Sequence, residues 1–152
     1  MEHVPTGHAK LSLGWSEMDQ QHDTLFRALH TLDQAPRRRP DDLREMRRIF
    51  SVLADHFRWE ETEMARLSFP DRSRHIADHQ RELWSLAQLL RRLEDLDDLD
   101  AQALSDCTAW TLRHVASMDA DFVQFALDRE TWDLRRECME LDYENRLASF
   151  SV

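Results

Sequence analysis

Helix-breaking residues are confined to a few places in this chain of 152 residues, and their distribution limits what it can fold into. The sequence contains only 2 glycines and 4 prolines, and no proline follows Pro70, so everything after residue 71 is free to be helical. Pro5 lies near the N-terminus, while Pro36 and Pro40 mark one predicted loop and Pro70 another. With 41% hydrophobic residues, the composition favours a helical globular protein and argues against a disordered or β-rich chain.

Apolar residues recur at spacings of three and four in four long segments, which is the pattern of amphipathic helices. We predict that the first helix covers about residues 18–34. Asp41 or Asp42 would be the N-cap of the second helix, which continues to about residue 67. The third helix is expected to begin near residue 71 and the fourth near residue 101. Their apolar stripes are formed, in chain order, by Leu25, Phe26, Leu29 and Leu32; Met46, Ile49, Phe50, Leu53, Phe57 and Met64; Ile76, Leu83, Leu86, Leu90 and Leu93; and Leu104, Cys107, Trp110, Val115, Met118, Phe122 and Phe125. Long helices with short connections predict an all-α fold, an up-down-up-down antiparallel four-helix bundle.

The bundle is expected to occupy residues 1–127, with residues 1–17 as an N-terminal arm. Residues 128–152 are interpreted as an extra C-terminal helical segment that is only weakly amphipathic. Its apolar stripe would be formed by Trp132, Leu134, Cys138 and Leu141. This segment is a candidate surface for a protein partner or for self-association, and a solvated, frayed helix is the alternative.

Charge and cysteine content exclude several classes of protein. The formal net charge is −10, with basic residues scattered among acidic ones, so neither nucleic acid nor an anionic membrane is an expected partner. No apolar run approaches the length that spans a membrane, and the N-terminal sequence lacks the apolar core of a signal peptide. Two cysteines, Cys107 and Cys138, are too few for a disulfide framework and are interpreted as small hydrophobic residues. The expected location is therefore the cytoplasm.

Polar residues occupy the apolar stripes at places where leucine would be expected. They are His22, His56, Glu60, His75, His79, His114 and Asp119. Burying imidazole and carboxylate groups on apolar faces is costly unless they bind something. Residues four apart on a helix lie one above the other, so His56 with Glu60 and His75 with His79 can each hold an ion. A lone histidine on such a face is usually a satisfied core residue, but five histidines and two carboxylates cannot easily satisfy one another. We therefore predict a metal site.

The number and type of these side chains predict two metal ions. Seven ligands exceed those of one tetrahedral zinc, and five imidazoles are too many nitrogens for calcium or magnesium. Two bridging carboxylates and one bridging oxide or hydroxide complete six ligands around an ion with three histidines. An ion with two histidines then has five ligands and one open position. Imidazole with carboxylate suits iron, and manganese and zinc are alternatives.

The ordered ligand series resembles the hemerythrin family, specifically its bacterial hemerythrin-like proteins. The likeness extends from Trp15 to about Phe125 and rests on the stretches WSEMDQQHDTLF, HFRWEETEM, FPDRSRHIADH and WTLRHVASMD. It implies a four-helix bundle, which the related myohemerythrin also has, and two iron ions bridged by oxide or hydroxide. The resemblance implies that His75, His79 and His114 hold the saturated iron. His22 and His56 would hold the iron with the open position, and Glu60 and Asp119 would bridge the two ions.

The resemblance also implies reversible dioxygen binding at the open iron, for storage, delivery or sensing. Six residues would line the oxygen pocket and also belong to the bundle core: Leu25, Phe57, Trp110, Thr111, Val115 and Met118. The competing function is a diiron oxidase, a ferroxidase or a peroxide-consuming enzyme. Ferritin-like diiron enzymes typically carry Glu-x-x-His pairs, which this sequence lacks, so an oxygen-binding protein is favoured over an enzyme.

Two local features of the fourth helix lead to further predictions. Residues five apart on an ideal α-helix differ in direction by roughly 140°, so His114 and Asp119 share a face only if a π-type turn separates them. Thr111 lies where members of the family commonly have a leucine-like residue. Its hydroxyl has two uses: a bond back to the carbonyl of Cys107, or a bond donated to the oxygen ligand.

Overall fold

All regular secondary structure in the described part of the chain is helical. The computed structural model describes residues 12–33, 41–96, 99–131 and 133, and no strand occurs within them. The elements are α1 (Ser16–Asp33), α2 (Asp42–Arg66), α3 (Arg72–Leu96), α4 (Ala101–His114) and the π-helical turn η1 (Val115–Asp119), after which helix continues over residues 120–131. The predicted all-α fold is confirmed.

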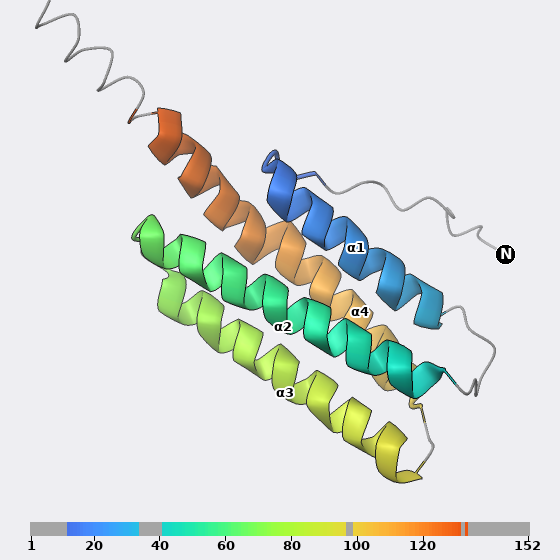
Figure 1. Ribbon diagram of the computed structural model, residues 1–152. Helices are drawn as coiled ribbons and strands as arrows, with labels where there is room; N and C mark the ends of the chain where they lie inside the picture. The colour runs from blue at the N-terminus through green and yellow to red at the C-terminus, as the bar shows by residue number, and fades with distance from the viewer. Residues whose placement is uncertain (1–11, 34–40, 97–98, 132, 134–152) are drawn as a thin grey trace, which may run out of the picture.

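Neighbouring helices run antiparallel. In Figure 1, α1 and α3 point one way along the bundle, and α2 and α4 point the other way. Each helix packs on two others: α1 and α3 both contact α2 and α4. This up-down-up-down order follows from the short connections, which bring each helix back beside the one before it.

The helix ends follow local sequence signals. Asp100 precedes α4, and its side chain accepts a hydrogen bond from the backbone N–H of Ala103 at 3.0 Å, as N-cap aspartates do. Asp41 holds the corresponding place before α2, but its side chain makes no capping bond. After α2, Ser68 adopts the left-handed conformation with φ of 57°, which glycine usually supplies at a helix end. This turn brings α3 back against α2.

The apolar core consists of two clusters with a polar layer between them. The larger cluster is formed by Leu25, Ala28, Leu29, Leu32, Met46, Ile49, Leu53, Phe57, Leu86, Leu89, Leu93, Leu104 and Cys107. The smaller cluster is formed by Met18, Met64, Leu67, Phe122, Val123 and Ala126. On α1, His22 separates Met18 of the smaller cluster from Leu25 of the larger one. On α2, His56 and Glu60 likewise lie between Leu53 and Met64, so the polar side chains of these two helices meet at one level.

The buried stripe of α3 differs from the predicted apolar row. Its buried residues are His75, His79, Glu82, Leu86, Leu89 and Leu93. Ile76, Leu83 and Leu90, which the apolar pattern assigned to the stripe, are only half-buried. The sequence offers two overlapping apolar rows, and the row that includes the histidines faces the bundle axis. Glu82 is buried for this reason.

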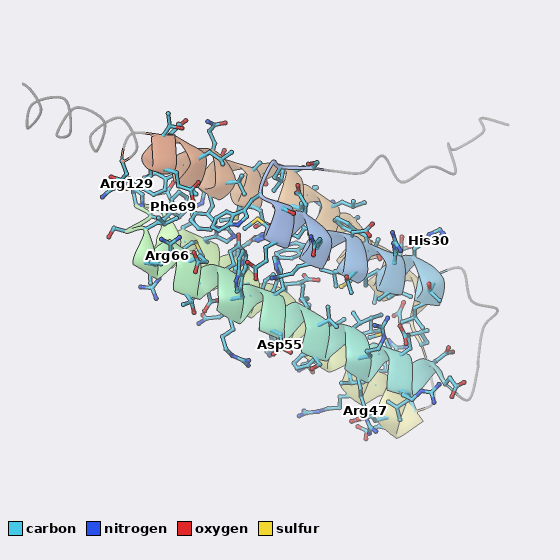
Figure 2. All side chains as sticks on the ribbon, turned by 45° about the horizontal axis from the view of Figure 1, so that its top comes forward. His30, Arg47, Asp55, Arg66, Phe69 and Arg129 are labelled. Atoms are coloured by element: carbon cyan, nitrogen blue, oxygen red, sulfur yellow. The ribbon has the colours of Figure 1, made fainter. Side chains whose placement is uncertain are left out.

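Charged side chains cover the outside of the bundle. Arg47, Asp55 and Arg66 are exposed on α2 (Figure 2). Among the described helices, none has the length and apolar character needed to cross a bilayer. The predicted C-terminal stripe lies outside the described residues, since it consists of Trp132, Leu134, Cys138 and Leu141.

Candidate metal centre

Seven buried side chains from all four helices converge in the polar layer. None of them is more than 4% exposed. Their nitrogen and oxygen atoms form two groups, within each of which the atoms lie no more than 4.8 Å apart. The first group contains Glu60, His75, His79, His114 and Asp119, and the second contains His22, His56 and Asp119. The structure thus brings together every residue that the sequence predicted as a ligand.

A π-helical turn brings His114 and Asp119 into the same group. The turn spans Val115–Asp119, immediately after α4 ends at His114. Because a π-turn takes up more residues than an α-turn, side chains five positions apart can point the same way. His114 Nε2 lies 2.9 Å from Asp119 Oδ1. The prediction of a π-type turn between these residues is confirmed.

Asp119 presents one oxygen to each group. Its Oδ1 lies 3.0 Å from His75 Nε2, and its Oδ2 lies 3.0 Å from His22 Nε2. Glu60 also lies between the groups, with Oε2 3.2 Å from His79 Nε2 and 3.9 Å from His56 Nε2. Asp119 therefore offers a different oxygen to each group, while Glu60 turns the same oxygen toward both.

Three of the imidazoles are held from outside the layer through Nδ1. His114 Nδ1 is 2.8 Å from Asp78 Oδ2, and His79 Nδ1 is 3.0 Å from Glu61 Oε1. Carboxylates only accept hydrogen bonds, so each Nδ1 carries the hydrogen and each Nε2 faces inward as a donor atom for a metal. His56 Nδ1 has the neutral amide oxygen of Gln21 at 2.8 Å.

Some inward-facing atoms contact one another closely, and others have no hydrogen-bond partner among the described residues. Nε2 of His114 lies 3.0 Å from Nε2 of His75 and 3.1 Å from Nε2 of His79. Lone pairs of neutral rings repel at such distances unless a proton or a metal ion lies between them. Seven buried atoms of the layer make no hydrogen bond: both ring nitrogens of His22, both carboxylate oxygens of Glu60, His56 Nε2, His75 Nδ1 and Asp119 Oδ2. Buried polar groups are rarely left unsatisfied, so this donor set fits metal cations.

The protonation of the layer also suits a cation. Burial and neighbouring imidazoles lower the pKa of His56 to about 3 and that of His79 to about 2, so both rings are neutral at pH 7. Burial would raise the pKa of Asp119, but His114 and the other close imidazoles outweigh it and lower that pKa well below its ordinary value. Burial and the neighbouring Asp119 raise the pKa of Glu60.

Protonation of His114 is an alternative to binding a metal cation. Burial would lower its pKa, but Asp119 and Asp78 outweigh burial and raise it. A proton on His114 and a metal ion are two ways of placing positive charge among the same atoms.

The six predicted pocket residues surround the polar layer in different ways. Phe57 stacks on His79, with ring centroids 3.8 Å apart, and Trp110 stacks on His114 at 4.6 Å. Val115, Leu25 and Thr111 are buried, and Met118 is half-buried. The hydroxyl of Thr111 donates to the carbonyl of Cys107 at 3.0 Å, which is the first of the two uses considered from the sequence.

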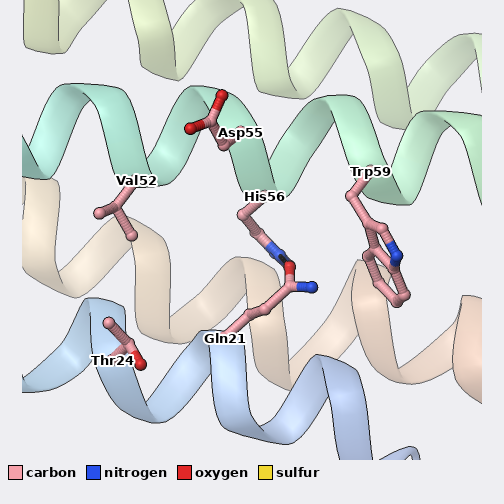
Figure 3. A pocket seen from close by; sticks show the side chains of 6 residues that line it. All are labelled: Gln21, Thr24, Val52, Asp55, His56 and Trp59. Carbon is pink, nitrogen blue, oxygen red and sulfur yellow. Dashed lines mark hydrogen bonds between the residues drawn. The ribbon is translucent and has the colours of Figure 1, made fainter.

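Figure 3 shows a cleft between α1 and α2 that reaches the outer edge of one imidazole. Its volume is about 250 Å³, and it is lined by Gln21, Thr24, Val52, Asp55, His56 and Trp59. The side chain of Gln21 crosses the cleft to His56 (Figure 3). His30, at the far end of α1, is exposed and belongs to neither group.

The sequence reasoning missed four residues next to the centre: Gln21, Glu61, Asp78 and Glu82. Each of the first three directly precedes or follows a predicted ligand, which gives only a weak signal because most such neighbours face solvent. Glu82 had a clearer signal. It lies three residues after His79 and four before Leu86, so it interrupts the same stripe as the histidines.

One comparison with known proteins identifies a relationship. The family model of the hemerythrin HHE cation binding domain matches residues 13–126, a range that includes both groups of converging side chains. Comparison with curated proteins gives no match. Comparison with solved structures gives none either.

Proposed function

The chain belongs to the hemerythrin HHE cation-binding family, and from this premise we propose that it binds dioxygen reversibly at a non-haem diiron centre. The observation that carries the proposal is the unequal division of the converging side chains into groups of five and three residues that share Asp119. Each group can hold one ion, and the smaller group leaves its ion short of ligands. Dioxygen would bind at that open position, for oxygen storage, delivery or sensing.

The ligand roles follow the two groups. His75, His79 and His114 would hold the saturated iron, and His22 with His56 would hold the iron that has the open position. Glu60 and Asp119 would bridge the ions together with an oxide or hydroxide. The distances that support this division are those of Asp119, which offers Oδ1 to His75 and His114 and Oδ2 to His22.

The surrounding side chains keep the site dry and orient its ligands. When bound, the iron ions supply the electrons that dioxygen binding requires. Phe57 and Trp110 stack on His79 and His114 and fix the planes of these rings. The proposed oxygen pocket is lined by Leu25, Phe57, Trp110, Thr111, Val115 and Met118. Because most of these side chains are apolar, they limit the water that can enter beside the ligand.

The hydrogen bonds behind the imidazoles make the two ions chemically unequal. Carboxylates back His79 and His114, whereas a neutral amide backs His56. A carboxylate partner increases the basicity of an imidazole and strengthens its bond to a metal. The ion held by His75, His79 and His114 is therefore bound more tightly, and the ion at the open position is the more easily lost.

The test is a cycle of oxygen addition and removal. Iron-loaded protein is reduced without air, exposed to oxygen and then returned to an oxygen-free atmosphere while its absorption spectrum is recorded. A coloured species that forms with oxygen and disappears when oxygen is removed supports reversible binding. Irreversible oxidation with continued oxygen consumption would instead support a diiron oxidase, a ferroxidase or a peroxide-consuming enzyme.

A further inference from the structure

A buried carboxyl group lies beside the centre but belongs to neither ligand group. Glu82 is 4% exposed, and it occupies the core-facing stripe of α3 between His79 and Leu86. In a bundle of this kind the position normally carries an apolar residue. Burying a carboxyl in such surroundings costs stability, so its presence needs a chemical reason.

The only hydrogen-bond partner that the described residues show for Glu82 is a thiol. Cys107 Sγ on α4 donates to Glu82 Oε1 at 2.8 Å. A thiol is a weak donor and does little to stabilise a carboxylate charge. Burial raises the pKa of Glu82, and it likewise raises the pKa of Cys107, which therefore remains a thiol.

Charged groups around Glu82 shift its pKa in both directions, and burial remains the largest influence on that pKa. Asp78 on α3 opposes the charge of the carboxylate, while His114 and Arg113 on α4 favour it. The charged groups that act most strongly on Glu82 therefore all lie on α3 and α4, and apolar side chains of the core cluster that contains Cys107, such as Leu25 and Phe57, come from α1 and α2.

The acid lies one helical turn from the histidine layer, on the side of the proposed oxygen pocket. Glu82 follows His79 by three residues, and its partner Cys107 precedes Thr111 by four. Thr111 is itself bonded to the carbonyl of Cys107 and is three residues before His114. Cys107 and Thr111 thus connect the carboxyl to the pocket along one face of α4.

We propose that Glu82 is the proton source of this pocket, through which a reduced oxygen ligand leaves as hydrogen peroxide. This inference rests on the proposed function. Two iron(II) ions each give up one electron, dioxygen gains two electrons, and its release as hydrogen peroxide takes up two protons. Glu82 gives its proton to the thiol sulfur of Cys107 and becomes a carboxylate, while that thiol passes its own proton to the Thr111 hydroxyl. The Thr111 hydroxyl turns away from the Cys107 carbonyl and passes its own proton to the ligand as the first of the two. Solvent supplies the second proton and later reprotonates Glu82, while two iron(III) ions remain.

The first test asks whether Glu82 holds a proton at pH 7. The infrared spectrum of the full-length, metal-free protein should contain the carbonyl band of a neutral carboxylic acid. Part of this band should disappear in Glu82→Gln and persist in Glu94→Gln, which changes an exposed carboxylate on the same helix. An unchanged band in Glu82→Gln would overturn the inference even if the iron-loaded protein binds oxygen.

The second test follows the decay of the oxygenated protein to its oxidised form. Glu82→Gln keeps the size of the side chain and an acceptor for Cys107 but has no proton to transfer. Its decay should be slower by roughly 100-fold, a contribution typical of general acids, and its solvent deuterium isotope effect should be smaller than that of the parent. Glu94→Gln should decay like the parent. Where Glu82→Gln folds poorly, Glu82→Leu provides the same comparison with an apolar side chain.

The outcomes separate this inference from the proposed function. Oxygen binding with equal decay rates and equal isotope effects in parent and variant would overturn the role of Glu82 alone. If no oxygenated species forms in the iron-loaded parent, the proposed function fails, and the inference fails with it.

Discussion

The hydrogen bond behind His114 gives the sharpest quantitative prediction for the centre. Asp78 Oδ2 lies 2.8 Å from His114 Nδ1, and the Asp78 side chain is 14% exposed. Burial would raise the pKa of Asp78, but hydrogen bonds from Arg81 and His114 outweigh it and lower that pKa, so the group is a carboxylate at pH 7. Asp78→Asn keeps an acceptor in place but removes its charge.

The expected magnitude follows from the strength of this bond. A hydrogen bond to a charged group contributes about 1.5–3 kcal/mol, and about 1.4 kcal/mol corresponds to a factor of ten in affinity. This range equals a loss of roughly 10–100-fold in metal affinity, as is typical when an outer partner of a metal-bound histidine is removed. Since asparagine can still accept the bond and Arg81 already shares the charge of Asp78, we expect about tenfold for Asp78→Asn. For Asp78→Ala, which removes the acceptor as well as the charge, the loss of metal affinity should approach about 100-fold.

The assay is an anaerobic titration of the metal-free protein with iron(II) in competition with a chelating indicator. The tighter of the two binding steps should weaken in Asp78→Asn, because His114 belongs to the group with more ligands. The matched control is Asp106→Asn, which makes the same charge change at an exposed residue of α4. If Asp78→Asn and Asp106→Asn bind iron equally tightly, Asp78 does not tune the metal site and the reasoning is wrong.

Three further predictions concern the bridge, the acid response and the C-terminal segment. Glu60→Ala removes a carboxylate proposed to bridge the ions and should lower both the iron content and the melting temperature, and an unchanged iron content would contradict the ligand assignment. Because folded His56 stays neutral down to about pH 3 while an unfolded histidine takes up a proton below its ordinary pKa, the metal-free protein should lose stability as the pH falls below about 6.5. His56→Gln should reduce the dependence of the unfolding free energy on pH, measured by urea titration, by up to about 1.4 kcal/mol per pH unit. An equal dependence in both proteins would refute the lowered pKa of His56. Ending the chain after Leu127 should leave oxygen binding intact while changing stability or association, and loss of iron would place the extension within the bundle domain.

Much of the fold was predictable because its determinants are local. Long stretches free of proline and glycine, with apolar residues three and four apart, set the helices to within a few residues. The five-residue spacing between His114 and Asp119 predicted the π-turn by geometry alone, since an ideal α-helix would point the two side chains apart. The domain boundary after Leu127 stays a prediction.

Features that depend on packing between helices were not predictable in the same way. Two overlapping apolar rows made the orientation of α3 ambiguous, and only the structure shows that Glu82 is buried while Leu83 is half-buried. The contact of Glu82 with Cys107 joins residues 25 apart on different helices, so no local pattern contains it. For Thr111 the residue type allowed two hydrogen bonds, and only the structure shows that its hydroxyl is bonded to the Cys107 carbonyl.

The position of the polar layer between two apolar clusters explains how the centre can exist before metal arrives. The layer by itself opposes folding, because it buries unsatisfied atoms of His22 and Glu60. Fully buried residues on either side, such as Ile49 of the larger cluster and Phe122 of the smaller one, hold the helices in register independently of the layer. Apolar burial thus supplies the preorganisation, and cation binding relieves the repulsion and the unsatisfied groups within the layer. Metal binding should therefore add stability to a bundle that is already folded, in contrast to small domains that fold only around their metal.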